Sequence, residues 1–254
     1  MRIIFLGTNG WYTTETGNTP CVLIDSKEGY IVFDAGNGIY RLDRYITEDK
    51  PIYLFISHFH LDHTSGLHTL SKFSFSQGID VYVGEGRKKD FDVLVNPPFT
   101  VGYLPNPENI NELETQIRLH ELSEVGDNIP FKAQAIKQHH AYVDHGYRLS
   151  LENKVIAYTG DLGFTDKALK LAQNADLLIS ECSSKKIVDD YPWGHLDPFL
   201  AAKLAKEGNV KQLILTHFGS DVYTNLESRK GAEESAKKIF PNTKAAMDGL
   251  EIVI

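Results

Sequence analysis

Three histidines and one aspartate lie within six positions of the sequence, in the stretch SHFHLDHT at residues 57–64. Imidazole and carboxylate groups are the usual protein ligands of Zn²⁺ and of similar divalent ions. His58 and His60 follow an apolar run, and residues two apart in extended backbone project to the same side, so both rings can converge on one point. Asp62 and His63 follow where the chain is expected to turn into a helix, and they can face a second point. A single histidine would be typical of a solvated loop, but three at this spacing indicate a metal site.

The elements that must position this cluster are short β-rich runs alternating with helical segments. Strands are expected at residues 2–7, 21–25, 30–36, 52–57, 79–84, 115–122, 131–138, 176–181 and 212–218, and a hairpin at 146–160. Helices are expected at residues 63–73, 165–175, 197–208 and 227–240. The third of these helices has Asp197 as N-cap, Pro198 in its first turn and Gly208 at C′. Residues 86–110 carry four prolines and are expected to form an irregular loop.

Mixed strands with interspersed helices favour two sheets packed face to face, with helices on the outer faces. The pattern therefore predicts the α/β class and a four-layer arrangement. The chain has 254 residues, with no internal repeat and no low-complexity linker, so we expect a single domain over residues 1–254.

Composition narrows the classes of function. The formal net charge of −8 argues against a broad nucleic-acid footprint, although it leaves room for a local basic patch such as residues 86–90. No apolar run approaches the roughly 20 residues that cross a bilayer, so no membrane partner is expected. Two cysteines are too few for a disulfide scaffold, and the opening MRIIFLGTNG is too short for a signal-peptide core. We therefore expect a cytoplasmic protein whose first residues form a strand.

The motif H-x-H-x-D-H after a strand resembles the signature of the metallo-β-lactamase fold superfamily. Companion segments occur in the same order as in that superfamily: GTNG at 7–10, FDAG at 33–36, HHAYVDHGYRL at 139–149, YTGD at 158–161 and LILTHF at 213–218. The resemblance spans nearly the whole chain. It implies an αββα sandwich of two mixed sheets with helices on the outer faces.

The resemblance also implies two divalent metal ions, with zinc favoured and manganese or iron as alternatives. The implied ligands are His58, His60 and His140 for the first ion, Asp62, His63 and His217 for the second, and Asp161 as a bridge between both. His139 and His140 are adjacent, and only one of them can point inward from a strand. We favour His140 because its spacing of six residues to Gly146 matches the ribonuclease Z branch, which leaves His139 as a neighbouring group.

Within the superfamily, ribonuclease Z-like phosphodiesterases resemble this chain best. The segments GYR, YTGD and LILTHFGSDVY are similar to theirs, and His195 takes the position of an extra histidine that assists phosphodiester cleavage. Trp193 and Gly194 indicate a shaped loop beside it. The branch's tRNA-binding arm, which many members insert between the ligands equivalent to His140 and Asp161, has no room here. True metallo-β-lactamases, flavodiiron proteins and glyoxalase II enzymes match less well.

The leading hypothesis is a metal-dependent hydrolase, a dinuclear phosphodiesterase acting on a small or cyclic phosphodiester. A metal-bridging hydroxide would attack phosphorus, Asp62 would orient or deprotonate it, and His195 would assist the leaving group. The alternatives are a ribonuclease Z-like endonuclease that processes RNA, a carbonyl-directed hydrolase of esters, lactones or thioesters, and a non-catalytic metal-binding protein. A homodimer is implied by the resemblance alone.

Several other residues are expected to be structural. Asp34 is expected to support a ligand or a turn, and residues 91–103 to form a packing loop rather than a lid. His68, His120, Asp144 and His145 are expected to be structural or exposed, and Cys182 to be a small buried hydrophobe.

Overall fold

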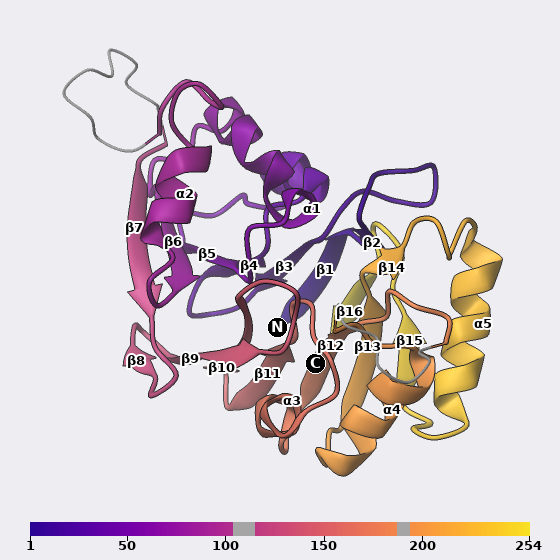
Figure 1. Ribbon diagram of the computed structural model, residues 1–254. Helices are drawn as coiled ribbons and strands as arrows, with labels where there is room; N and C mark the ends of the chain where they lie inside the picture. The colour runs from indigo at the N-terminus through magenta and orange to yellow at the C-terminus, as the bar shows by residue number, and fades with distance from the viewer. Residues whose placement is uncertain (104–114, 187–193) are drawn as a thin grey trace.

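The computed structural model describes residues 1–103, 115–186 and 194–254, and these residues form two seven-stranded sheets (Figure 1). The first sheet has the strand order β16 (Glu251–Val253), β1 (Arg2–Gly7), β3 (Cys21–Asp25), β4 (Tyr30–Phe33), β5 (Ile52–Ile56), β6 (Ile79–Gly84) and β7 (Ile117–Leu122). The second has the order β15 (Thr243–Ala245), β13 (Gln212–Thr216), β12 (Leu177–Glu181), β11 (Lys154–Tyr158), β10 (Asp144–Leu151), β9 (Lys132–Gln138) and β8 (Asp127–Asn128). A short parallel pair joins β2 (Asn9–Gly10) to β14 (Phe218–Gly219).

Helices cover the outer face of each sheet. The α-helices are α1 (Leu61–Thr64), α2 (Lys88–Leu94), α3 (Asp166–Ala172), α4 (Pro198–Glu207) and α5 (Leu226–Lys237), and the 3-10 helices are η1 (Asn37–Arg44) and η2 (Ser65–Lys72). In Figure 1, α1 and α2 lie on the side of the first sheet, and α3, α4 and α5 lie on the side of the second.

Three buried hydrophobic clusters correspond to the three interfaces of a four-layer sandwich. The central cluster joins both sheets, and within it the rings of Phe33 and Tyr158 stack at 4.7 Å between centroids. A second cluster packs strands of the first sheet against residues such as Leu67 and Phe91, and a third packs the second sheet against residues such as Ala201. Burial of this apolar area is the main stabilising contribution to the fold. The αββα arrangement predicted from the sequence is confirmed.

The parallel parts of the two sheets explain where polar residues can gather. Strands β4, β5 and β6 run parallel in the first sheet, and β11, β12 and β13 run parallel in the second. The carboxyl ends of parallel neighbours meet at one edge of a sheet. Polar residues lie at or shortly after the ends of these strands: Asp34 after β4, Ser57 and His58 after β5, Asp161 three positions after β11, Ser183 two positions after β12 and His217 after β13.

Most of the expected elements are present, and three details were wrong. Residues 88–94 form α2 where an irregular loop was expected, because Phe91 is fully buried against the first sheet. The expected helix at 63–73 is one short α-helical turn followed by η2. Gly208 is the C-cap of α4 with φ −72°, and Asn209 after it takes the left-handed conformation at φ +52°. Asp197 does cap α4, accepting the Leu200 N–H at 2.8 Å.

Some expectations fall outside the described residues, namely Pro105 and Pro107 of the expected loop and Trp193 beside His195. Phe91, Val95 and Tyr103 belong to the hydrophobic core, so the described part of residues 91–103 packs against the fold as expected. Among the described residues, no helix combines the length and the apolar character needed to cross a membrane.

Candidate metal centre

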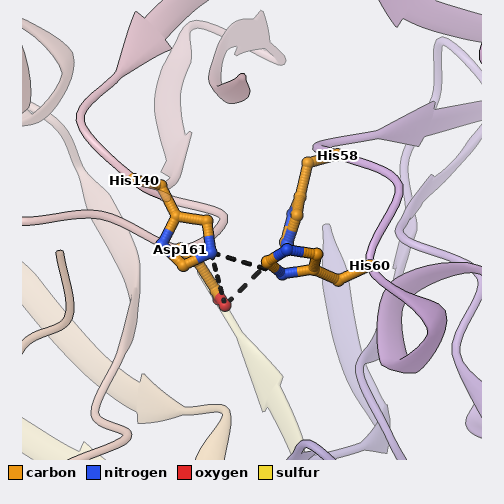
Figure 2. A group of neighbouring side chains, drawn as sticks. All are labelled: His58, His60, His140 and Asp161. Atoms are coloured by element: carbon orange, nitrogen blue, oxygen red, sulfur yellow. Dashed lines mark hydrogen bonds and ion pairs between the residues drawn. The ribbon is translucent and has the colours of Figure 1, made fainter. Parts of the chain in front are cut away.

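The first cluster of candidate ligands is His58, His60, His140 and Asp161, whose ligand atoms all lie within 4.8 Å of one another (Figure 2). His140 Nε2 lies 3.3 Å from His60 Nδ1 and 3.9 Å from Asp161 Oδ2, and His58 Nε2 lies 4.0 Å from the same oxygen. Atoms bound about 2.0–2.1 Å from one tetrahedral ion lie roughly 3.4 Å apart. The cluster is therefore close to the size that a single divalent ion requires.

The second cluster is Asp62, His63 and His217. Asp62 and His63 lie in α1, and His217 directly follows β13 with φ +50°, an uncommon conformation for a residue other than glycine. His63 Nε2 lies 3.0 Å from His217 Nε2, and Asp62 Oδ2 lies 3.2 Å from His217 Nε2 and 3.6 Å from His63 Nε2. These three donors surround a second point; the spacing of the motif predicted such a point for Asp62 and His63, and the family resemblance implied His217.

Asp161 lies between the two clusters. Its Oδ2 faces the first, and its Oδ1 lies 3.4 Å from His63 Nε2 and 3.3 Å from His217 Nε2 in the second. Asp161 Oδ1 and His58 Nε2 are buried, yet neither has a hydrogen-bond partner among the residues that the structure describes. Buried polar atoms are almost always hydrogen-bonded, so an exception calls for an explanation such as a bound ion. The donor set and these unpartnered atoms fit a pair of divalent cations.

A neighbouring group on Nδ1 orients four of the five candidate ligand histidines. The contacts are His58 Nδ1 to Asp144 Oδ2 at 2.7 Å, His63 Nδ1 to Asp34 Oδ2 at 2.7 Å, His217 Nδ1 to Ser183 Oγ at 2.7 Å and His140 Nδ1 to the Gly194 carbonyl at 3.2 Å. Each contact turns Nε2 of that ring toward the centre. Carboxylate and carbonyl partners of this kind fix the orientation of metal-ligating histidines and raise their basicity.

Burial and charge act differently in the two clusters. Burial lowers the pKa of His58 well below its usual value, and the neighbouring His63 lowers it further. Burial alone would also lower the pKa of His63, but the carboxylates of Asp62, Asp161 and Asp34 outweigh it and raise that pKa well above the usual value. The carboxylates of the second cluster therefore favour positive charge at this point, which a bound cation would supply.

His195 lies beside the two clusters and is held by Glu181. Its Nδ1 lies 2.9 Å from Glu181 Oε1 and 4.0 Å from Asp161 Oδ2. Burial opposes protonation of the ring, but the carboxylates of Glu181 and Asp161 outweigh it and raise the pKa of His195 to about 9. The carboxylates of Glu181 and Asp161 therefore favour the protonated form of this ring next to the candidate metal centre. Glu181 itself is fixed by the Leu162 and Ser183 backbone N–H groups, which donate to its two oxygens at 3.1 and 3.0 Å.

A cavity of about 610 Å³ opens onto these residues. Asp62, Asp161, His195 and His217 line it, together with Trp11. Structural metal sites are closed by protein ligands, whereas catalytic sites keep an open position for water and substrate. The open cavity is therefore what a catalytic centre needs.

The structure brings together all seven of the ligands predicted from the sequence, and it places His195 next to them. His140 points to the centre, whereas His139 is exposed and contributes its carbonyl, which accepts the Gly163 N–H at 2.8 Å. His68 and His120 lie elsewhere; His120 Nε2 contacts Asp80 at 2.8 Å. Binding of metal by the seven residues stays a prediction.

Three supporting residues were not recognised in the sequence. Asp144 was expected to be structural and is buried, but its specific contact with His58 was not foreseen. Glu181 and Ser183 were not singled out, although both lie where the buried strand β12 ends, between the strands that carry Asp161 and His217. Their position at the carboxyl end of a parallel strand was the feature of the sequence that could have identified them as supporting residues.

Comparisons with known proteins agree with this geometry. Residues 30–218 match the family model described as the beta-lactamase superfamily domain. The chain is 26% identical to the ribonuclease Z of Archaeoglobus fulgidus, over 100% of this chain and 97% of the relative. The metallo-β-lactamase fold protein YhfI of Bacillus subtilis superposes with a TM-score of 0.80 at 20% identity, over 99% of this chain and 98% of that one. The short form of human tRNase Z superposes with a TM-score of 0.74 at 24% identity, over 100% and 99%. Because the family model covers well over half of the residues, the chain belongs to the beta-lactamase superfamily and has the metallo-β-lactamase fold.

Proposed function

We propose that this protein is a dinuclear metal-dependent phosphodiesterase that hydrolyses a small or cyclic phosphodiester. The observation that carries the proposal is the position of Asp161, with Oδ1 turned to His63 and His217 and Oδ2 turned to the first cluster. A carboxylate shared by two groups of donors in an open cavity suits a pair of ions about 3.5–4 Å apart. Zinc is favoured, with manganese or iron as alternatives, because histidine and aspartate suit all three.

When bound, the two ions would supply a hydroxide nucleophile at neutral pH and neutralise charge on the phosphate. The residues of the chain have distinct tasks around that chemistry. Asp62 accepts the Trp11 N–H at 2.8 Å, so its carboxylate has a fixed orientation from which it aligns the attacking water and takes up the proton that this water loses on becoming hydroxide. His195 donates a proton to the leaving oxygen, and Glu181 positions its ring.

A phosphodiester fits this site better than a neutral ester. Two divalent ions against the carboxylates of Asp62 and Asp161 would leave the centre net positive, and the protonated form of His195, which Glu181 favours, would add a further positive charge. Positively charged sites attract anionic substrates and stabilise the extra charge that phosphoryl transfer develops. The charge of the site therefore supports an anionic diester over an ester, lactone or thioester.

RNA is the second candidate substrate, because relatives such as the Archaeoglobus fulgidus protein are named ribonuclease Z. That alignment extends over 314 positions, so the relative has about 60 positions without a counterpart in this chain of 254 residues. Between His140 and Asp161, the chain forms the hairpin of β10 and β11, which turns at Glu152 and Asn153. The compact hairpin and the net charge of −8 favour a small substrate over tRNA.

The test is hydrolysis of bis(p-nitrophenyl) phosphate by chelator-stripped protein that is reloaded separately with zinc, manganese or iron. We expect metal-dependent turnover, its loss in Asp62→Ala, and its retention in Asp43→Ala, a matched change at an exposed ion pair with Lys72. Absence of turnover with every metal, despite two bound ions per chain, would reject the phosphodiesterase. Turnover of p-nitrophenyl acetate under those conditions would identify a carbonyl-directed hydrolase instead. Binding of tRNA with a steep salt dependence would favour the nuclease.

A further inference from the structure

An aromatic pair stands at the mouth of the cavity. The side chain of Trp11 is 67% exposed and that of Tyr12 is 43% exposed, and their rings meet edge to face at 5.2 Å between centroids. Isolated exposed apolar residues are common and need no explanation. Trp11 is different because its side chain lines the same cavity as Asp62 and His217, together with the 70% exposed Leu61.

The backbone of this loop is in direct contact with the candidate metal centre. The Trp11 N–H donates to Asp62 Oδ2 at 2.8 Å. Gly10 lies against the ring of His217 so closely that a Cβ at this position would be 2.5 Å from a ring carbon. The backbone that carries the indole therefore has a fixed place beside the point where a phosphate would be held.

The loop is also held rigidly. Trp11 has φ +73°, which is a genuine outlier for a bulky residue and persists only where the surrounding structure enforces it. The next residue provides that restraint, because the Tyr12 carbonyl accepts from Ser220 Oγ at 2.5 Å and from Asn9 Nδ2 at 3.1 Å. Asn9 is held in turn by the buried guanidinium of Arg229, which contacts its Oδ1. The backbone that presents the indole is thus preorganised, which reduces the entropy lost on binding.

We propose that Trp11 is a specificity-determining residue whose indole stacks against a nucleobase of the substrate. The inference rests on the proposed function, since it places the phosphate of the same molecule at the metal centre. It narrows the substrate class to a small nucleotide diester, and it disfavours a simple sugar phosphate. Stacking tolerates every base, because each has a π face, so Trp11 would favour nucleotides without selecting one base.

The probes are AMP and ribose 5-phosphate, which share the ribose and the phosphate and differ by the base. Their dissociation constants are measured by calorimetry on the zinc-loaded protein and on Trp11→Ala, Trp11→Leu and Trp11→Phe. We expect the wild type to bind AMP about tenfold more tightly than ribose 5-phosphate. In Trp11→Ala and Trp11→Leu the two dissociation constants should become nearly equal, whereas in Trp11→Phe most of the preference for AMP should remain. Phe99→Ala, a change at a comparably exposed aromatic residue away from the cavity, should leave the ratio unchanged.

Equal affinities for the two probes in the wild type would overturn the inference, and so would an unchanged ratio in Trp11→Ala with normal zinc content. Failure of AMP to bind a protein that hydrolyses bis(p-nitrophenyl) phosphate would overturn it as well, with the proposed function intact. Conversely, a Trp11-dependent ratio without turnover of any diester would reject the proposed function and leave the stacking site standing. If Trp11→Ala does not fold, quenching of tryptophan fluorescence by AMP in the wild type but not in Trp11→Phe gives the same information, since the chain has only two tryptophans.

Discussion

The two ligand clusters contain similar residues but are built differently. In the first, three histidines come from two segments 80 positions apart, and His60 is an exposed residue. In the second, His63 and His217 are buried and contact each other and Asp62 at 3.0–3.6 Å. Within the described residues, His58 Nε2 has no hydrogen-bond partner, whereas the rings of the second cluster have partners on both nitrogens. His58 in the first cluster is thus uncompensated on the side that faces the centre, while both rings of the second cluster are compensated by neighbouring polar groups.

The residues behind each cluster differ in the same way. Asp34, behind His63, also accepts the Ser57 N–H at 2.7 Å and the Tyr158 hydroxyl at 2.6 Å, and so joins the metal centre to the central core. Asp144, behind His58, accepts the Asp161 N–H at 3.1 Å but keeps one oxygen without a partner. The second cluster is therefore part of the structural framework, and the first depends more on the ion it would bind.

The largest effect is expected where both clusters meet. Asp161→Asn keeps the shape of the side chain but replaces one oxygen with an amide that cannot bind a cation. We expect loss of both ions and a fall in kcat of at least about 1000-fold, because the two-ion site would lose both its charge balance and its shared ligand. Bound metal per chain and turnover of bis(p-nitrophenyl) phosphate measure this result. Retention of two ions and near-normal turnover would show that Asp161 is no bridge.

His195 belongs to neither cluster and should affect chemistry without affecting metal content. His195→Ala should lower kcat by about 100-fold for a diester with an alkyl leaving group, the usual contribution of a general acid. The loss should be much smaller for bis(p-nitrophenyl) phosphate, because nitrophenolate leaves without a proton. Glu181→Gln should also lower kcat more for the alkyl leaving group than for nitrophenolate, but by a smaller factor. The reason is that it weakens the contact of 2.9 Å by which Glu181 holds the ring of His195. An equal loss for both leaving groups would indicate a structural role.

The difference between the clusters also explains what the sequence could predict. His58, His60, Asp62 and His63 are close together in the chain, so strand and helix periodicity was enough to bring them to one place. His217 contacts His63 across 154 positions, and no local pattern encodes that distance. It was found only because the later motifs resemble those of a known superfamily.

The same distinction holds for the fold. Strands such as β1 and β5 were predicted because they are continuous buried apolar runs bounded by polar residues. Helix α2 was missed because a single buried side chain, Phe91, anchors it in a proline-rich segment. Asp144 and Glu181 were missed as supporting residues because a carboxylate's partner is decided by tertiary packing, which the sequence does not display.

The next prediction compares the two carboxylates that orient the histidines. Asp34→Asn and Asp144→Asn should each weaken metal binding by about 10–100-fold, the first at the second cluster and the second at the first. Asp34→Asn should also lower the free energy of unfolding by about 2–4 kcal/mol, because several buried donors lose a charged acceptor. Asp144→Asn should cost less stability, since fewer donors depend on it. Zinc content across a series of buffered zinc concentrations and urea unfolding of the metal-free variants measure the two effects.

If Asp34→Asn and Asp144→Asn lose the same free energy of unfolding, the second cluster is no more a part of the structural framework than the first, and the proposed difference between the clusters is wrong. A matched change at Asp80, which binds Arg118 and His120 away from the cavity, serves as the control. Asp80→Asn should leave zinc affinity unchanged, although it breaks an ion pair of its own.

The smallest effect is expected at Ser183, an uncharged side chain that orients the ligand histidine His217. Its Oγ lies 2.7 Å from His217 Nδ1, and the residue lines the cavity, so water can replace the hydroxyl in Ser183→Ala. A neutral hydrogen bond contributes about 0.5–1.5 kcal/mol, so zinc affinity at the second cluster should fall no more than about tenfold. Ser183→Thr, which keeps the hydroxyl, should bind zinc like the wild type. If Ser183→Ala loses as much zinc affinity as Asp34→Asn, then a hydroxyl partner and a carboxylate partner hold the histidines of the second cluster equally well. In that case the negative charge of the carboxylate bonded to the histidine is not what makes this cluster rigid.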